Sequence, residues 1–184
     1  MARLVEFKKE ELLEKTIDYI RKNGTKKMTA RNLCHFIGCS TQPLYKNFGN
    51  MHTLNETIKE YLKNYYDNFM NNIINKNAYL YTSNYSYTLF ALEEPNLFEA
   101  LFMNNLNKTR TIEDALKNEY DIEVIESIPM QYHLSRKQSE RLYRDVKIYT
   151  YGLSCQIVYN GLLLKKEDIG ILIKNAISNL KKDI

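Results

Sequence analysis

Apolar residues recur at helical spacing in the first part of the chain. Leu13, Ile17 and Ile20 fall on one side of a helix predicted over residues 9–23. Two short helices are expected next, separated by a sharp turn at Gly38. The first begins after an N-cap at Thr29 and the second begins at Ser40; their expected buried residues are Ala30, Leu33, Cys34, Ile37, Leu44 and Phe48.

The same spacing continues through the rest of the chain. Asn50 can cap a helix whose apolar stripe runs from Leu54 to Ile73. Ser135 and Gln138 form a capping box, which predicts a helix from there to Asn160. Further helices are expected over 85–93, from Pro95 through Phe102, over 111–126 with an end before Pro129, and over 167–180, with a loop over 104–109.

No segment alternates between apolar and polar residues with the period of a strand. The pattern therefore predicts an all-α fold of about nine helices. A chain of 184 residues has room for one domain or two small ones. A division into residues 1–53 and 54–184 is expected, because the character of the chain changes there.

The balance of basic and acidic residues differs between the two parts of the chain. The formal net charge is +4, but residues 1–54 hold ten basic and five acidic residues, whereas the remainder holds sixteen basic and seventeen acidic residues. No acidic residue occurs between Asp18 and Glu56. A stretch of this kind attracts polyanions, although a solvated basic face is the plainer interpretation. The basic residues within it are Arg21, Lys22, Lys26, Lys27, Arg31 and Lys46.

The order of helix, glycine turn and helix from Thr29 to Phe48 is typical of a helix-turn-helix, whose second helix lies in the major groove of DNA. The outward residues of that helix are expected to be Thr41, Gln42, Tyr45, Lys46 and Asn47. A glutamine amide can pair with adenine, and the methyl group of threonine or the ring of Pro43 can contact a thymine methyl group. Thr29, Arg31 and the open amide groups of helix N-termini can hold phosphates, and Ser40 is a further candidate DNA contact.

This segment resembles the TetR family of bacterial transcriptional regulators. The matching residues are Thr29 and Ala30, Leu33, Ile37 to Ser40, Leu44 to Phe48, and Leu54. The resemblance implies that Tyr45 contacts the DNA backbone, that Thr41, Gln42 and Pro43 meet bases, and that Thr29 and Lys46 meet phosphates. Members of the family commonly have a lysine where this chain has Met51, so a phosphate contact there would depend on backbone amides or on His52.

The resemblance also implies a C-terminal domain that binds a ligand and dimerises through its last two helices. The expected partners are a palindromic double-stranded operator, a second copy of the chain and a small-molecule effector, with no cofactor. Aromatic residues are the candidate lining of a ligand pocket, and ordinary core packing is the alternative for each of them. The candidates are Tyr61, Tyr65, Tyr85, Phe90, Phe98, Phe102, Tyr143 and Tyr149.

Two long apolar-faced helices at the end of the chain have more surface than one subunit buries, which predicts a two-fold dimer. The uncharged stretch 148–164 is expected to be a buried helix rather than a membrane span, because it carries polar residues and is short. The candidate interface residues are Tyr151, Cys155, Tyr159, Ile169, Leu172, Ile173, Ala176, Ile177 and Leu180.

Cys34, Cys39 and Cys155 are expected to be reduced thiols in a cytoplasmic protein, because the first residues do not form a signal peptide. No catalytic motif or metal-ligand spacing is present, so an enzyme is not expected. The favoured function is a repressor that a small molecule releases from a palindromic operator. The alternative keeps the DNA-binding segment but assigns the C-terminal domain to docking a protein partner or to dimerisation alone.

Overall fold

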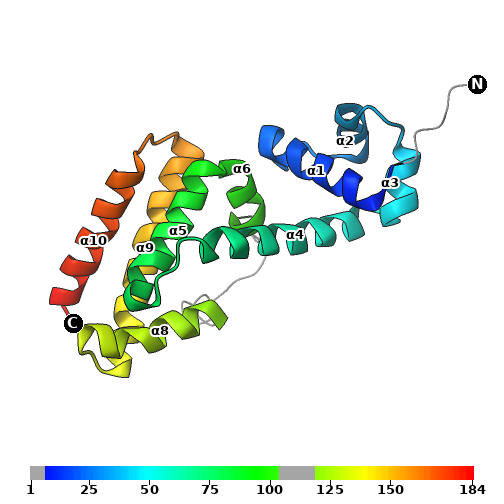
Figure 1. Cartoon of the computed structure of the whole chain (residues 1–184). Coiled ribbons are helices and arrows are strands. Elements are labelled where there is room, and N and C mark those ends of the chain that lie inside the picture. The colour runs from blue at the N-terminus through cyan, green and yellow to red at the C-terminus, as the bar shows by residue number, and fades with distance from the viewer. Residues whose placement is uncertain (1–6, 104–118) are drawn as a thin grey trace, which may run out of the picture. The chain divides into compact units, whose positions relative to one another are not determined.

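The computed structural model describes residues 7–103 and 119–184, and every regular element within them is a helix (Figure 1). The fold is all-α, with nine α-helices in the described residues, as the sequence pattern predicts. They are α1 (Lys9–Asn23), α2 (Ala30–Ile37), α3 (Thr41–Phe48), α4 (Met51–Asn71), α5 (Tyr79–Glu93), α6 (Pro95–Phe98), α8 (Glu119–Tyr132), α9 (Arg136–Asn160) and α10 (Lys166–Lys182). A 3-10 turn over Lys76–Ala78 precedes α5, and a π-helical turn over Glu99–Met103 follows α6.

Several predicted helix ends are confirmed because their caps form. Asn50 Oδ1 accepts a hydrogen bond from the backbone N–H of Thr53 at 2.9 Å at the start of α4. The capping box of Ser135 and Gln138 opens α9, which ends at Asn160 before a left-handed Gly161.

Two predicted boundaries are wrong. Helix α5 begins at Tyr79 rather than Tyr85, because Asn75 caps the preceding turn and the helix is then buried on several sides. Helix α8 passes through Pro129 and ends at Tyr132. Proline removes one backbone donor, but Ile125 and Ile128 anchor this part of the helix in the core. The predicted loop over 104–109 and the predicted helix start at 111 lie outside the described residues.

The chain packs as two compact units. The first contains the described residues up to Tyr65 together with Glu94 to Met103, and the second contains Tyr66 to Glu93 together with the residues from 119 onward. The segment that follows α5 therefore packs with the N-terminal helices. This division concerns packing, and a DNA-binding domain over residues 1–53 stays a prediction.

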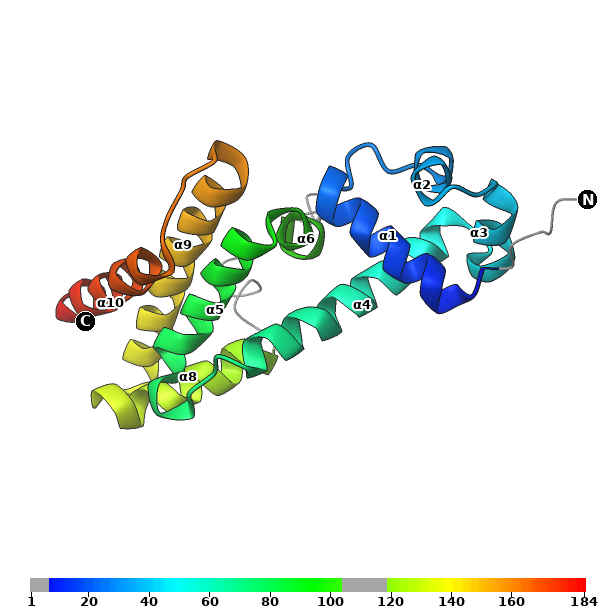
Figure 2. The same cartoon turned by 45° about the horizontal axis from the view of Figure 1, so that its top comes forward.

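In the first unit, α1 packs against α2, α3 and α6 (Figure 2). The fully buried residue of α1 near its start is Leu12, whereas Leu13 is half-buried, so the predicted stripe is shifted by one residue there. Ala30 and Ile37 of α2 are also half-buried. The core of the unit includes Leu12, Ile17, Ile20, Leu33, Cys34, Leu44, Phe48 and Leu54.

In the second unit, α5 is central, and α8, α9 and α10 all pack against it (Figure 2). Helix α10 approaches α5 closely at Gly170, where a Cβ atom would lie 2.9 Å from the hydroxyl oxygen of Tyr81. Small polar residues of α5 are buried and bonded, and Thr150 of α9 donates a hydrogen bond to Asn84 Oδ1 at 2.8 Å. The apolar core includes Leu80, Leu89, Val124, Ile128, Leu142, Val146, Ile169 and Ile173.

Uncharged residues of α9 do not form a wholly buried helix. Val146 and Ile157 face the core, whereas Ile148, Tyr151 and Tyr159 are exposed. The expectation of a buried helix over 148–164 is therefore wrong for one side of α9, and also for residues 161–164, which lie beyond its end and include the exposed Leu163. In the parts of the chain that the structure describes, none of the helices combines the length and apolar character needed to cross a membrane.

Candidate nucleic-acid interface

A tight turn joins α2 to α3. Thr29 Oγ1 caps α2 by accepting a hydrogen bond from the N–H of Asn32 at 3.1 Å. At the other end, Gly38 takes the left-handed conformation with φ of 80°, which a side chain would strain. Helix α3 starts at Thr41, and the glycine therefore allows two helices to follow each other with only three residues between them.

Helix α3 buries one side and exposes the other. Leu44 and Phe48 are buried in the core of the unit, as predicted. The exposed side carries two side chains that offer hydrogen bonds to base edges and two that can reach phosphates. These exposed residues are Thr41, Gln42, Tyr45 and Lys46.

Asn47 does not share that exposed side. It is half-buried, and its amide donates to the carbonyl of Pro43 at 2.9 Å and to that of Phe7 at 3.3 Å. Because these bonds occupy the amide within the protein, the predicted outward position of Asn47 is corrected. Pro43 is itself half-buried in the first turn of α3.

The remaining candidate DNA contacts lie around helix starts. Thr29 precedes α2 and Arg31 is its second residue; Ser40 precedes α3, and His52 is the second residue of α4. All four are exposed, whereas Met51 is half-buried. Helix starts carry backbone N–H groups that favour anions, so these positions suit phosphate contacts.

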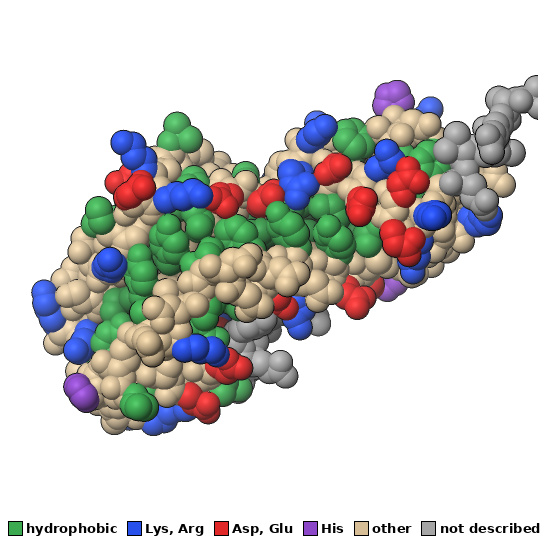
Figure 3. All heavy atoms as spheres, in the orientation of Figure 1, with side chains coloured by type: hydrophobic (Ala, Val, Ile, Leu, Met, Phe, Trp, Pro, Cys, Tyr) green, Lys and Arg blue, Asp and Glu red, His purple; other side chains and the backbone are tan. Residues whose placement is uncertain are grey.

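Two cations of the acid-free stretch are matched by carboxylates from a distant segment. Arg21 pairs with Glu94 at 2.9 Å, and Lys26 pairs with Glu99 at 3.1 Å. Figure 3 shows acidic and basic side chains close to one another over α1, on the side of the first unit that faces the viewer. The excess positive charge of this unit is consequently smaller than the sequence count indicates.

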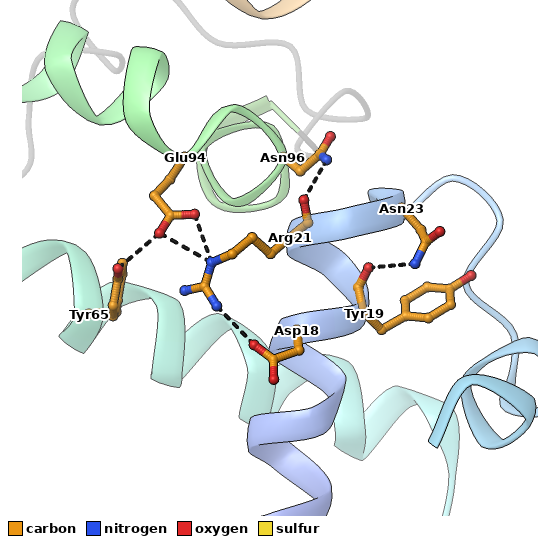
Figure 4. Close-up of polar contacts among 7 residues, drawn as sticks. All are labelled: Asp18, Tyr19, Arg21, Asn23, Tyr65, Glu94 and Asn96. Atoms are coloured by element: carbon orange, nitrogen blue, oxygen red, sulfur yellow. Dashed lines mark hydrogen bonds and ion pairs between the residues drawn. The ribbon is translucent and has the colours of Figure 1, made fainter. Parts of the chain in front are cut away.

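Glu94 is the centre of a polar cluster within the first unit (Figure 4). Arg21 Nε donates to both carboxylate oxygens of Glu94 at 2.9 and 3.2 Å, and Tyr65 Oη donates to the same carboxylate at 3.0 Å. Arg21 also pairs with Asp18 at 3.0 Å, and its carbonyl accepts from Asn96 Nδ2 at 2.8 Å. The hydrogen bond to Glu94 raises the pKa of Arg21, and burial, followed by Glu94, raises the pKa of Tyr65.

Glu94→Gln is expected to lower the free energy of unfolding by about 1–2 kcal/mol, because the Arg21 guanidinium loses a charged partner while remaining partly open to water. Glu56→Gln is the matched control: Glu56 also accepts from a basic side chain, Lys59 at 2.7 Å, but its side chain is 54% exposed against 16% for Glu94. The control should leave the stability unchanged, because an exposed ion pair contributes little. Urea unfolding measures both, and equal small losses would mean that the Glu94 cluster contributes little.

The eight candidate pocket residues are divided between the two units. In the first unit, Tyr61 stacks on Tyr65 with ring centroids 6.5 Å apart, and Phe98 lies 5.0 Å from Phe102. Phe98 is fully buried, so it contributes to packing. A shared pocket for all eight stays a prediction.

The other four pocket candidates belong to the second unit. Phe90 is fully buried against Tyr66 and Phe69, Tyr85 stacks on Tyr81 at 5.8 Å, and Tyr149 is exposed. The fourth, Tyr143, is buried and bonded to Asp121.

Asp121 is a residue that the sequence did not single out. It is 3% exposed, and its carboxylate accepts hydrogen bonds from Tyr143 Oη and from Lys147 Nζ, the latter at 2.6 Å. Burial and then the charge of Asp121 raise the pKa of Tyr143, so the phenol stays neutral. The spacing of Tyr143 and Lys147 places them on one side of a helix, but only the packing of α8 on α9 identifies their partner.

The predicted dimer residues also separate into two groups. Tyr151 and Tyr159 are exposed on α9, and Cys155, Leu172 and Leu180 are half-buried. The apolar stripe of α10 is instead buried within the chain against α5 and α9, which corrects its assignment to a dimer interface. The buried residues are Ile169, Ile173, Ala176 and Ile177.

No family model and no curated protein matches the chain. Among the described residues, no three His, Cys, Asp or Glu side chains gather closely enough to hold a metal ion. The candidate functional surface is therefore the exposed side of α3 together with the turn that presents it.

Proposed function

We propose that the chain is a DNA-binding transcriptional regulator in which α2 and α3 act as a helix-turn-helix. The observation that carries the proposal is the exposed side of α3, where Thr41, Gln42, Tyr45 and Lys46 lie together beyond a tight glycine turn. This side comes from a stretch of sequence without acidic residues. Such a helix suits the major groove, where polar side chains reach base edges and the phosphates attract cations.

Each exposed residue has a distinct proposed role. Gln42 pairs with an adenine edge, and the methyl group of Thr41 contacts thymine. Tyr45 and Lys46 contact phosphates, and the N-terminal amides of α2 and α4 hold the flanking backbone with Thr29 and His52 nearby. These contacts position the protein and read bases at the same time.

The exposed apolar side of α9 supports a homodimer. Ile148, Tyr151 and Tyr159 lie on this side, and no charged residue occurs between Lys147 and Lys165. An uncharged surface of this kind is typical of an interface between subunits. Two copies related by a two-fold axis would present two α3 helices to a palindromic operator in the cytoplasm, with half-sites about 34 Å apart.

Control by a small molecule is the regulatory part of the proposal. Glu94, which immediately follows the last residue of α5, is bonded to Arg21 of α1. A ligand bound within the second unit that moves the end of α5 would therefore act on a residue tied to α1. A coupling free energy of about 1–3 kcal/mol between the two sites is typical of such regulation. DNA should weaken ligand binding by the same factor by which the ligand weakens DNA binding.

Gln42→Ala and Tyr45→Phe separate base reading from phosphate contact. Gln42→Ala is expected to lose about tenfold discrimination at one base pair, because the amide that pairs with adenine is removed. Tyr45→Phe is expected to weaken binding to all duplexes by a similar factor of about five, because a phosphate contact carries no sequence information.

Fluorescence anisotropy with a matched and a mismatched duplex measures both variants. Asn64→Ala is the control. It also removes an exposed polar side chain, but from α4 rather than α3, and this variant should bind as the unsubstituted protein does. Loss of the same selectivity in Gln42→Ala and Tyr45→Phe would contradict the assigned roles. Normal binding by both would contradict the use of α3.

A further inference from the structure

Two thiols meet at the turn between α2 and α3. Cys34 lies in α2 and is 2% exposed, whereas Cys39 follows Gly38 and is half-buried. The backbone N–H of Cys39 donates to the carbonyl of Cys34 at 3.0 Å, and that of Gly38 donates to the carbonyl of His35 at 3.3 Å. This pair of hydrogen bonds is the Schellman motif, which sets the side chains at the positions of Cys34 and Cys39 against each other.

The two cysteine side chains interact within the turn. The Cys39 thiol lies within hydrogen-bonding reach of Cys34, and burial, together with Cys39, raises the pKa of the Cys34 thiol to about 11. The 3.0 Å hydrogen bond from the N–H of Cys39 to the carbonyl of Cys34 keeps the two residues side by side, which a disulfide between them requires. Two apolar side chains would pack in this motif equally well. Two thiols can in addition be oxidised to a disulfide, which the packing of the turn does not require.

We propose that Cys34 and Cys39 form a reversible dithiol–disulfide switch at the turn between α2 and α3, with a hydroperoxide as the oxidant. Cys39 reacts first because it is the more accessible thiol. Its thiolate attacks the peroxide oxygen, which gives a sulfenic acid and releases an alcohol, or water where the oxidant is hydrogen peroxide.

Cys34 then resolves the sulfenic acid. Its thiol attacks the sulfur of Cys39 and loses its proton as the S–S bond forms, and the leaving hydroxide takes up that proton as water. In total, two thiols and one hydroperoxide give one disulfide, one alcohol and one water, and the two electrons pass to the cleaved O–O bond. A cellular dithiol reverses the reaction by exchange.

The disulfide changes the start of α3. The sulfur atoms must close to about 2.0 Å, and Ser40 and Thr41 follow Cys39 directly. A shift of the turn therefore moves the first residues of α3, including those assigned to bases. This consequence for DNA rests on the proposed function, whereas formation of the disulfide does not.

Mass spectrometry of the full chain tests disulfide formation. The reduced protein is treated with hydrogen peroxide, alkylated and digested with trypsin, which yields one peptide over residues 32–46 that holds Cys34 and Cys39 but not Cys155. We expect this peptide to lose two hydrogen atoms, to escape the first alkylation, and to gain two alkyl groups when reduction with dithiothreitol is followed by a second alkylation. A peptide that is still alkylated at both cysteines, or a sulfinic acid on Cys39 beside a reduced Cys34, would overturn the proposal.

Variants separate the chemistry from its effect on DNA. Cys39→Ser replaces the less buried thiol and should prevent the disulfide in a folded protein, while Cys155→Ser should leave it unchanged. Oxidation of the unsubstituted protein should weaken binding to a selected duplex about tenfold, dithiothreitol should restore it, and Cys39→Ser should not respond. A disulfide that forms without any change in affinity would overturn the switch. If the reduced protein binds no DNA, the proposed function fails, while the mass measurement still decides whether the disulfide forms.

Discussion

Replacing Asp121 with alanine is expected to lower the free energy of unfolding by about 3 kcal/mol. The carboxylate is buried, and it accepts hydrogen bonds from Tyr143 and Lys147. Without it, the Tyr143 hydroxyl stays in the core without this acceptor, and the Lys147 ammonium must turn toward water. Urea unfolding followed by far-ultraviolet circular dichroism measures the loss.

Further variants test whether the loss of stability in Asp121→Ala comes from the cluster that Asp121 forms with Tyr143 and Lys147. Glu126→Ala is the control on the same helix, because Glu126 is exposed and only approaches Arg136 at 3.8 Å; it should change stability by less than about 0.5 kcal/mol. Asp121→Ala combined with Tyr143→Phe should cost less than the sum of the two single changes, because the phenylalanine no longer buries an unpaired hydroxyl. Strict additivity, or an Asp121→Ala protein as stable as the control, would show that the cluster is not a source of stability.

Ile148→Glu is expected to separate the proposed dimer and to raise its dissociation constant by about 30-fold or more. Ile148 is 56% exposed in the single chain and lies on the uncharged side of α9. A glutamate there would bring two like charges into the proposed interface and leave them without counter-ions. When the dimer separates, the affinity for a duplex with two half-sites should also fall, because each copy would bind its half-site alone.

Sedimentation velocity at several protein concentrations measures the oligomeric state. Met130→Glu is the control, because Met130 is also exposed, at 90%, but lies on α8. The control should remain a dimer and bind the duplex normally. A monomeric unsubstituted protein, or an Ile148→Glu protein that stays dimeric, would contradict the use of α9 in self-association.

Local signals in the sequence predict much of the fold. The bounds of α9 follow from Ser135, Gln138 and Gly161, each of which acts on backbone groups beside it. The exposed and buried sides of α3 follow from the spacing of Leu44 and Phe48. These features depend on neighbours in sequence, so the periodicity and the caps reveal them.

Features that depend on distant partners are not predicted. The start of α5 is hidden because small polar residues such as Thr82 and Asn84 are buried there, which removes the apolar stripe. The pairing of Arg21 with Glu94 reduces the available positive charge by a contact that no local pattern reveals. The same is true of Asp121, whose partners belong to another helix.

Selection of duplexes from a random DNA pool, repeated at two salt concentrations, is the decisive test of sequence-specific DNA binding. Specific readout survives the higher salt better than general phosphate attraction, because only the latter depends wholly on released counterions. A sequence-specific dimer should yield a palindromic consensus with two half-sites about one helical turn apart, recovered at both salt concentrations. Binding that disappears with salt and yields no consensus would contradict a sequence-specific dimeric regulator.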